Sequence, residues 1–224
     1  MNRQESKKIK FNDEFFSALL SALGTILSLV GVALIIIQAQ LANKPWHVFS
    51  FLIYGWGLLC MFTASALYHG VNGSEKLNHL LHQFDYFAIF VMIAGTFTPF
   101  CLILLRNHTG WRVLGLMWLF AGLGITLKAF FPKMPKWLST AFFIGMGWVA
   151  VFIAYPVYQI LSWKGVLPLI LGGIVYTAGA IIFYLEKPNP FPGKFGFHEI
   201  WHLFVLAGAG IHFYAIYYYL LPYG

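Results

Sequence analysis

Long apolar runs separated by short polar breaks fill the chain from residue 16 to residue 221. A helix that crosses a bilayer needs about 20 mainly apolar residues, and seven runs reach that length. They cover residues 16–40, 46–70, 83–105, 111–131, 137–161, 165–186 and 197–221. Most breaks contain Pro, Gly or Asn, and the weakest break lies at residues 162–165. The pattern predicts an all-α, polytopic membrane protein, with residues 1–224 forming one seven-helix transmembrane domain.

The composition agrees with a membrane location. Hydrophobic residues make up 60% of the chain and charged residues only 9%, whereas soluble domains carry about 25% charged residues. So few charges cannot cover a water-facing surface. The net charge of +7 is scattered among the breaks and forms no basic patch, which argues against nucleic-acid binding. The two cysteines lie inside apolar runs and make no disulfide framework.

The basic residues predict the orientation of the bundle. If the N-terminus is cytoplasmic, ten Lys and Arg residues fall on the inner side and four on the outer side. The inner ones are Arg3, Lys7, Lys8, Lys10, Lys76, Lys128, Lys133, Lys136, Lys187 and Lys194. Because cytoplasmic loops are enriched in Lys and Arg, we expect the N-terminus inside and the C-terminus outside. Residues 1–15 then form a basic cytoplasmic tail.

Polar residues from three predicted helices come to one depth under this topology. Ser65 and His69 end the second helix on its inner side, and Asp85 lies near the inner start of the third. The last helix begins inside with His198 and His202, which share a face because they are four residues apart. Ionisable groups at membrane depth are expensive, so such a cluster indicates a functional site.

Three imidazoles and one open position are what a catalytic zinc site requires. We therefore predict that His69, His198 and His202 bind Zn²⁺. Asp85 is expected beside a water molecule at the metal, and Ser65 is expected to support the site by hydrogen bonding. A single histidine in a membrane helix is more often an interhelical hydrogen-bonding residue, but the convergence of three histidines and an aspartate favours a metal site.

Other histidines are given lesser roles. His212 follows His202 by ten residues, or about 15 Å along a helix, and is expected to be structural. His79 and His82 are placed in the inner loop before the third helix, as supporting or interface residues near the site.

The stretch His198-Glu199-Ile200-Trp201-His202 also fits the H-E-x-x-H signature of zinc metalloproteases, in which the glutamate is a general base. No acidic residue follows His202, so any further metal partner must come from His69 or Asp85. An intramembrane protease is therefore a disfavoured alternative.

The wider set of residues resembles the hemolysin III family, the bacterial branch of the progestin and adipoQ receptor group that includes the adiponectin receptors. The resemblance rests on Ser65-x-x-x-His69, Asp85 and His198-x-x-x-His202, with supporting stretches at residues 84–99 and 195–213. It implies a seven-helix bundle in the bacterial inner membrane, with zinc held by the three histidines and an aspartate acting near the zinc-bound water.

The resemblance also suggests an activity. Related alkaline ceramidases carry a similar serine, aspartate and histidine set and cleave lipid amides, which implies a zinc-dependent hydrolase acting on a membrane lipid or fatty-acyl substrate. The animal receptors have a non-acidic residue where Glu199 stands, so the resemblance does not make Glu199 an essential base. Many bacterial members carry Asn-x-x-Thr-His early in helix one, where this chain has Ser17 to Ser21, and no polar contact from that helix is predicted.

Two alternatives remain open. The zinc could be structural, clamping the second and seventh helices while the protein senses or regulates the state of the membrane without catalysis. A pore-forming cytolysin is suggested only by the family's name, and the chain lacks the rings of charge that line many channels.

Overall fold

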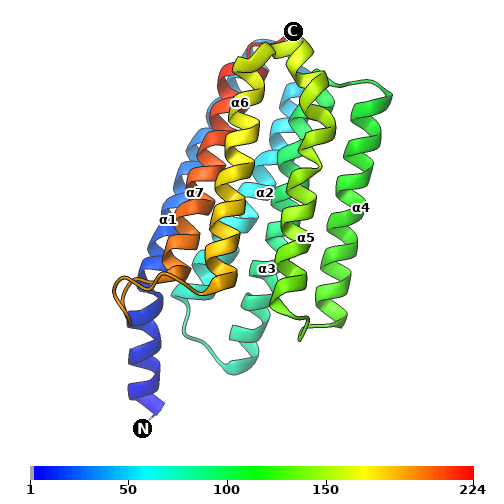
Figure 1. The fold of residues 1–224 in the computed structure, drawn as a ribbon. Helices are drawn as coiled ribbons and strands as arrows, with labels where there is room; N and C mark the ends of the chain where they lie inside the picture. The colour runs from blue at the N-terminus through cyan, green and yellow to red at the C-terminus, as the bar shows by residue number, and fades with distance from the viewer. Residues whose placement is uncertain (1–2) are drawn as a thin grey trace.

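The structure, a computed structural model, is a bundle of long helices (Figure 1). It describes the backbone of residues 3–224 and the side chains from residue 14 onward. The α-helices are α1 (Arg3–Leu41), α2 (Pro45–Gly70), α3 (Glu75–Pro99), α4 (His108–Phe130), α5 (Lys136–Trp148), α6 (Ala150–Leu185) and α7 (Phe197–Ala215). Short π-helical segments, Phe100–Leu104 and Ile216–Leu220, extend α3 and α7.

Within the described residues, six helical segments are long and apolar enough to cross a membrane. One of them, Lys136–Leu185, has 50 residues and would measure about 75 Å as a straight helix, far more than a bilayer core of about 30 Å. Ser162 breaks it with non-helical backbone angles, φ 57° and ψ −169°, and the chain reverses direction there (Figure 1). The Trp148 indole N–H donates a 3.1 Å hydrogen bond to Thr177, across the two arms.

These observations confirm an all-α polytopic membrane protein and the predicted break at residues 162–165. The two chain ends lie at opposite ends of the bundle (Figure 1). The side of the membrane that each end faces stays a prediction.

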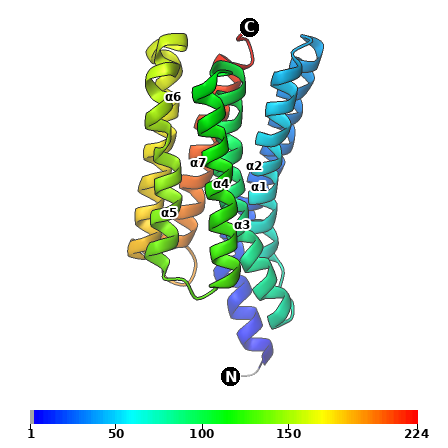
Figure 2. The same ribbon diagram turned by 90° about the vertical axis from the view of Figure 1, so that its right-hand side faces the viewer.

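Helix α3 lies at the centre of the bundle, as its burial shows. Of its most apolar stretch 72% is buried, against 28% for the corresponding stretch of α1. Helices α1, α2 and α3 pack side by side in chain order, and α6 packs against α7 (Figure 2). Helices α1 and α7, the first and last of the chain, also pack against each other. At the lower end of the bundle in Figure 1 this contact lies where α2 ends and α3 and α7 begin.

Two boundaries differ from the sequence prediction. The side chain of Ser74 accepts a hydrogen bond from the backbone N–H of Leu77, so α3 begins at Glu75 rather than at residue 83. His79 and His82 therefore lie on α3, and their placement in a loop was wrong. The polar first turns of a capped helix carry no hydropathy signal, which is why an apolar-run count misses them.

The structure also differs from the prediction at the start of the chain, where residues 1–15 were expected to form a tail before the first helix. Residues 3–15 continue α1 as helix, while residues 1 and 2 lie outside the described residues.

The first turn of α7 is held by two side-chain caps. The Glu199 carboxylate accepts a 2.8 Å hydrogen bond from the backbone N–H of Gly196, and Asn189 Oδ1 accepts one of 3.1 Å from Phe197 N–H. Both satisfy N–H groups that a helix start leaves without an intrahelical partner. They fix the turn that carries the first histidine of α7.

Candidate metal centre

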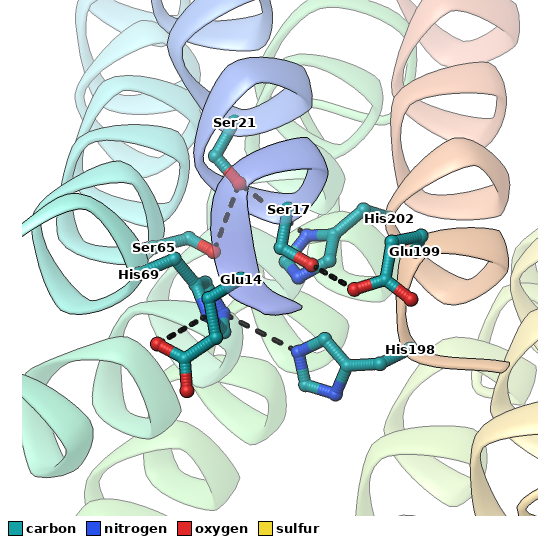
Figure 3. Close-up of polar contacts among 8 residues, drawn as sticks. All are labelled: Glu14, Ser17, Ser21, Ser65, His69, His198, Glu199 and His202. Atoms are coloured by element: carbon teal, nitrogen blue, oxygen red, sulfur yellow. Dashed lines mark hydrogen bonds and ion pairs between the residues drawn. The ribbon is translucent and has the colours of Figure 1, made fainter. Parts of the chain in front are cut away.

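Three histidines meet at the lower end of the bundle (Figure 3). His69 comes from the last turn of α2, and His198 and His202 come from the first turns of α7. One ring nitrogen from each lies within 4.8 Å of the others. His69 and His202 are buried and His198 is half-buried. The predicted convergence of these three residues is confirmed.

The spacing suits a shared metal ion. His69 Nε2 and His198 Nε2 are 3.3 Å apart. Two nitrogens bound to one tetrahedral zinc at about 2.0–2.1 Å would be separated by roughly the same distance, about 3.3 Å. His202 Nε2 is buried and has no hydrogen-bond partner among the described residues. Buried polar atoms usually have a partner, so the three nitrogens fit a metal. Imidazole suits several transition metals, and the geometry alone does not choose among them.

Hydrogen bonds run from this cluster to Ser65, which lines the same cavity as Asp85. The Ser21 hydroxyl donates a 3.0 Å hydrogen bond to the Ser65 hydroxyl. Ser21 has then used its only proton, so it must accept from His202 Nδ1 at 3.3 Å. This order places the imidazole proton of His202 on Nδ1 and leaves the Nε2 lone pair for a metal (Figure 3).

Helix α1 contributes more to the site than the sequence predicted. The Glu14 carboxylate lies 3.8 Å from His69 Nδ1, and Ser17 donates a 2.8 Å hydrogen bond to Glu199. With Ser21, these residues place a polar face of α1 against the cluster (Figure 3). The signal was the helical spacing of Glu14, Ser17 and Ser21, which puts them on one face. The departure from the bacterial pattern in this helix thus still leaves polar contacts in place.

Glu199 does not point a free oxygen at the histidines. One carboxylate oxygen accepts from Ser17 and the other accepts from the backbone N–H of Gly196. The side chain is buried, with 6% of its surface exposed. Its contacts tie α1 to α7 and cap α7, so the geometry does not support the glutamate role of the H-E-x-x-H pattern.

His82 and His79 lie outside the histidine cluster. The His82 ring packs between Tyr68 and Tyr86, with centroid distances of 5.0 Å to each, and it lines the cavity described below. His79 is exposed on the first turns of α3. The aromatic packing of His82 gives it a place beside the site without making it a ligand.

A mostly apolar cavity of about 190 Å³ opens on the cluster. Ser65, Asp85, His198 and His202 line its lower part. From there it extends into the bundle between α3, α5, α6 and α7 and reaches His212. The cavity thus brings Asp85 and two of the three histidines to one shared apolar space.

Lys136, at the start of α5, also lines the lower part of this cavity. Its ammonium group lies 4.1 Å from the centroid of the Phe183 ring and forms a 2.8 Å ion pair with Glu186. The hydrogen bond from Lys136, reinforced by its charge, lowers the pKa of the exposed Glu186 carboxyl below its usual value. A cation therefore lines the same cavity as the histidine cluster.

The fold and site define a class: a polytopic membrane protein with a buried three-histidine cluster, able to hold a metal, at one end of an apolar cavity. Residues 9–213 match the family described as Haemolysin-III related, and the chain belongs to that family. This confirms the resemblance seen in the sequence.

Three relatives show the breadth of the family. The chain is 37% identical to Hemolysin-3 of Bacillus cereus over 210 residues, which cover 94% of this chain and 93% of that protein. It is 28% identical over 201 residues to the human Monocyte to macrophage differentiation factor, covering 86% of this chain and 78% of the relative. It is 25% identical over 209 residues to the Adiponectin receptor protein of Drosophila melanogaster, covering 85% of this chain and 47% of that one.

Proposed function

We propose that this protein is a zinc-dependent hydrolase that cleaves amide or ester bonds of membrane lipids. The observation that carries the proposal is the position of the histidine cluster and Asp85 on one apolar cavity. A mostly apolar space beside a metal suits a substrate that carries an alkyl chain. A fatty-acyl chain would occupy the cavity and bring its carbonyl to the histidines.

His69, His198 and His202 would hold the zinc ion. When bound, zinc supplies an electrophile that polarises a carbonyl group and lowers the pKa of water towards about 7. Asp85 then accepts a proton from the attacking water at its carboxylate and returns it to the leaving amine or alcohol. Ser65 lines the cavity together with Asp85 and would hold that carboxylate in place by hydrogen bonding, while the apolar walls would exclude other water from the reaction.

We further propose that the lower end of the bundle faces the cytoplasm. The basic residues of the sequence support this orientation, because ten of the fourteen fall on that side. The site would then act on lipids of the inner leaflet. The relatives in Bacillus support a bacterial plasma membrane as the location.

A non-catalytic role is the second candidate. The cluster joins α2 to α7, and Ser17 and Ser21 join both to α1, so a bound metal could act as a clamp in a protein that senses or regulates the state of the membrane. A clamp has no use for a proton acceptor beside the metal. The two candidates therefore differ in what they require of Asp85.

The Asp85→Asn variant separates them. A hydrolase should keep its zinc but lose about 10²–10⁴-fold in turnover of a fluorescent lipid amide, because proton transfer contributes about that much. The matched control is Glu75→Gln, an exposed acid on the first turn of α3 that does not line the cavity, which should leave turnover unchanged. No hydrolysis by the zinc-loaded parent, or full turnover in Asp85→Asn, would reject the hydrolase.

A further inference from the structure

The upper end of the cavity is also polar. His212 of α7 and Tyr176 of α6 line it, and their ring centroids are 5.5 Å apart. Both rings occupy space that a side chain on a facing glycine would fill. A Cβ atom at Gly172 would collide with the His212 ring, and one at Gly208 would lie 2.8 Å from the Tyr176 ring. The two glycines therefore make room for two polar side chains at the end of an apolar cavity.

The protonation of His212 follows from its one hydrogen bond. His212 Nε2 lies 3.4 Å from the backbone carbonyl of Leu169, and a carbonyl only accepts. Nε2 therefore carries the proton, and Nδ1 presents a lone pair. This Nδ1 atom is buried and has no hydrogen-bond partner among the described residues. It is an acceptor without a donor, on a residue that lines the cavity.

The tyrosine ring that packs beside His212, that of Tyr176, carries a weakly partnered hydroxyl group. Tyr176 Oη has Met92 Sδ at 3.9 Å, and a thioether sulfur is a weak acceptor. Buried polar atoms in native proteins almost always have partners. An unpartnered acceptor on His212 and a weakly partnered hydroxyl on the adjacent Tyr176, both on residues that line the cavity, indicate a polar group that binds there.

We propose that the upper end of the cavity is a second polar site that binds a hydroxyl group on the chain of a lipid whose carbonyl lies at the histidine cluster. The hydroxyl would donate to His212 Nδ1 and accept from the hydroxyl of Tyr176. A ketone or ether oxygen at the same place cannot donate, so it would leave Nδ1 without a partner. His202 and His212 are ten residues apart on α7, which sets the separation of the two lipid groups at about 15 Å. This inference rests on the proposed function for the lipid class.

Binding to the unmodified, full-length protein in lipid nanodiscs tests the inference. A fluorescent fatty amide would be displaced by a saturated long-chain N-acyl amide, by hydroxylated analogues with the hydroxyl moved stepwise along the chain, and by the matching ketones. We expect one hydroxyl position to bind about tenfold more tightly than the saturated chain, since two hydrogen bonds of ordinary strength give roughly this factor. The ketone at that position can accept from Tyr176 but cannot donate to His212, so its gain should be about threefold or less.

Variants then assign the gain to the residues. His212→Phe and Tyr176→Phe keep an aromatic ring and remove the polar atoms, and each should reduce the preference for the hydroxyl to about threefold or less. The control is Tyr217→Phe, the same change on the helix that continues α7, where the tyrosine hydroxyl lies 3.5 Å from Gln38 and away from the cavity lining. It should keep the full preference.

Three results would overturn the inference. They are equal binding of saturated, hydroxylated and ketone lipids, a hydroxyl preference that survives in both His212→Phe and Tyr176→Phe, and failure of every lipid to bind. Turnover is read separately. A hydroxyl preference without hydrolysis removes the proposed hydrolase and keeps the second site, whereas hydrolysis without a hydroxyl preference removes only the second site.

Discussion

Helix α7 carries a buried histidine at each end of one cavity. In each histidine one ring nitrogen is held by a hydrogen bond, and the two ends differ in what the other ring nitrogen faces. At the lower end, His202 is held through Nδ1 by Ser21, and its Nε2 faces two other imidazoles. At the upper end, His212 is held through Nε2 by a backbone carbonyl and faces a tyrosine ring. A buried imidazole can therefore serve as a metal ligand or as a hydrogen-bond acceptor. Its neighbours decide which.

The surrounding helices differ in the same way. The lower end receives a carboxylate and a hydroxyl group from α1, Glu14 beside His69 and Ser21 beside His202, which orient these imidazoles. The upper end is shaped by Gly172 and Gly208, which supply space and no polar atoms. At the lower end, polar side chains hold imidazoles that could bind a metal ion. At the upper end, the lack of side chains on the two glycines leaves space for part of a ligand.

The largest effect is expected for a variant that disrupts only the lower end of the cavity. Replacing both His198 and His202 with alanine removes two of the three nitrogens, and a zinc site needs at least three protein ligands. Zinc measured by elemental analysis of the purified protein should fall from about one ion per chain to background. His212→Ala is the control and should retain the metal. Loss of zinc in His212→Ala would erase the distinction between the two ends.

Ser21→Ala tests whether hydrogen bonding to the far ring nitrogen supports the metal ligand. The variant leaves all three imidazoles in place but frees His202 Nδ1, so zinc affinity should fall by about 10–100-fold, as for other residues that orient metal ligands. Competition with a chelating dye measures the affinity. Ser28→Ala alters a buried serine further along the same helix and should have no effect on zinc. An unchanged affinity in Ser21→Ala would contradict the hydrogen-bond order derived above.

Gly172→Ala tests the upper end. The added methyl group meets the His212 ring, whereas the same change at Gly173 meets nothing within 4 Å. Overpacking of this kind typically costs about 1–3 kcal/mol, so Gly172→Ala should unfold at a lower temperature in detergent than Gly173→Ala. Both variants should bind zinc like the parent. Equal thermal stability of the two variants would show that the space around His212 is not closely packed.

The smallest effect is expected for Glu199→Gln. The amide can still accept from the N–H of Gly196 and can pair with the hydroxyl of Ser17, so the unfolding free energy should change by less than about 1 kcal/mol. Zinc content and lipid-amide turnover should be unchanged. A large loss of turnover with zinc retained would restore the metalloprotease-like role of this glutamate.

Depth in the membrane could be predicted from the sequence. Hydropathy locates the spanning helices, and their number and order tell which helix ends lie on the same side of the membrane. His69, Asp85, His198 and His202 could therefore be placed at one depth in the bilayer without coordinates. The break at residues 162–165 could be predicted for the same reason, since no single helix of 50 residues fits across a bilayer of about 30 Å. The family resemblance was visible in the same residues.

Rotation about each helix axis was decided only by the tertiary structure. The sequence left Ser17 and Ser21 without a predicted contact and offered Glu199 as a possible base, whereas packing turned α1 towards α7 and used Glu199 as a tie between them. It also placed His212 beside Tyr176 on a cavity shared with the metal centre. The hydrophobic thickness of the bilayer determines the depth at which a residue lies, whereas side-chain packing between helices determines which residues it contacts.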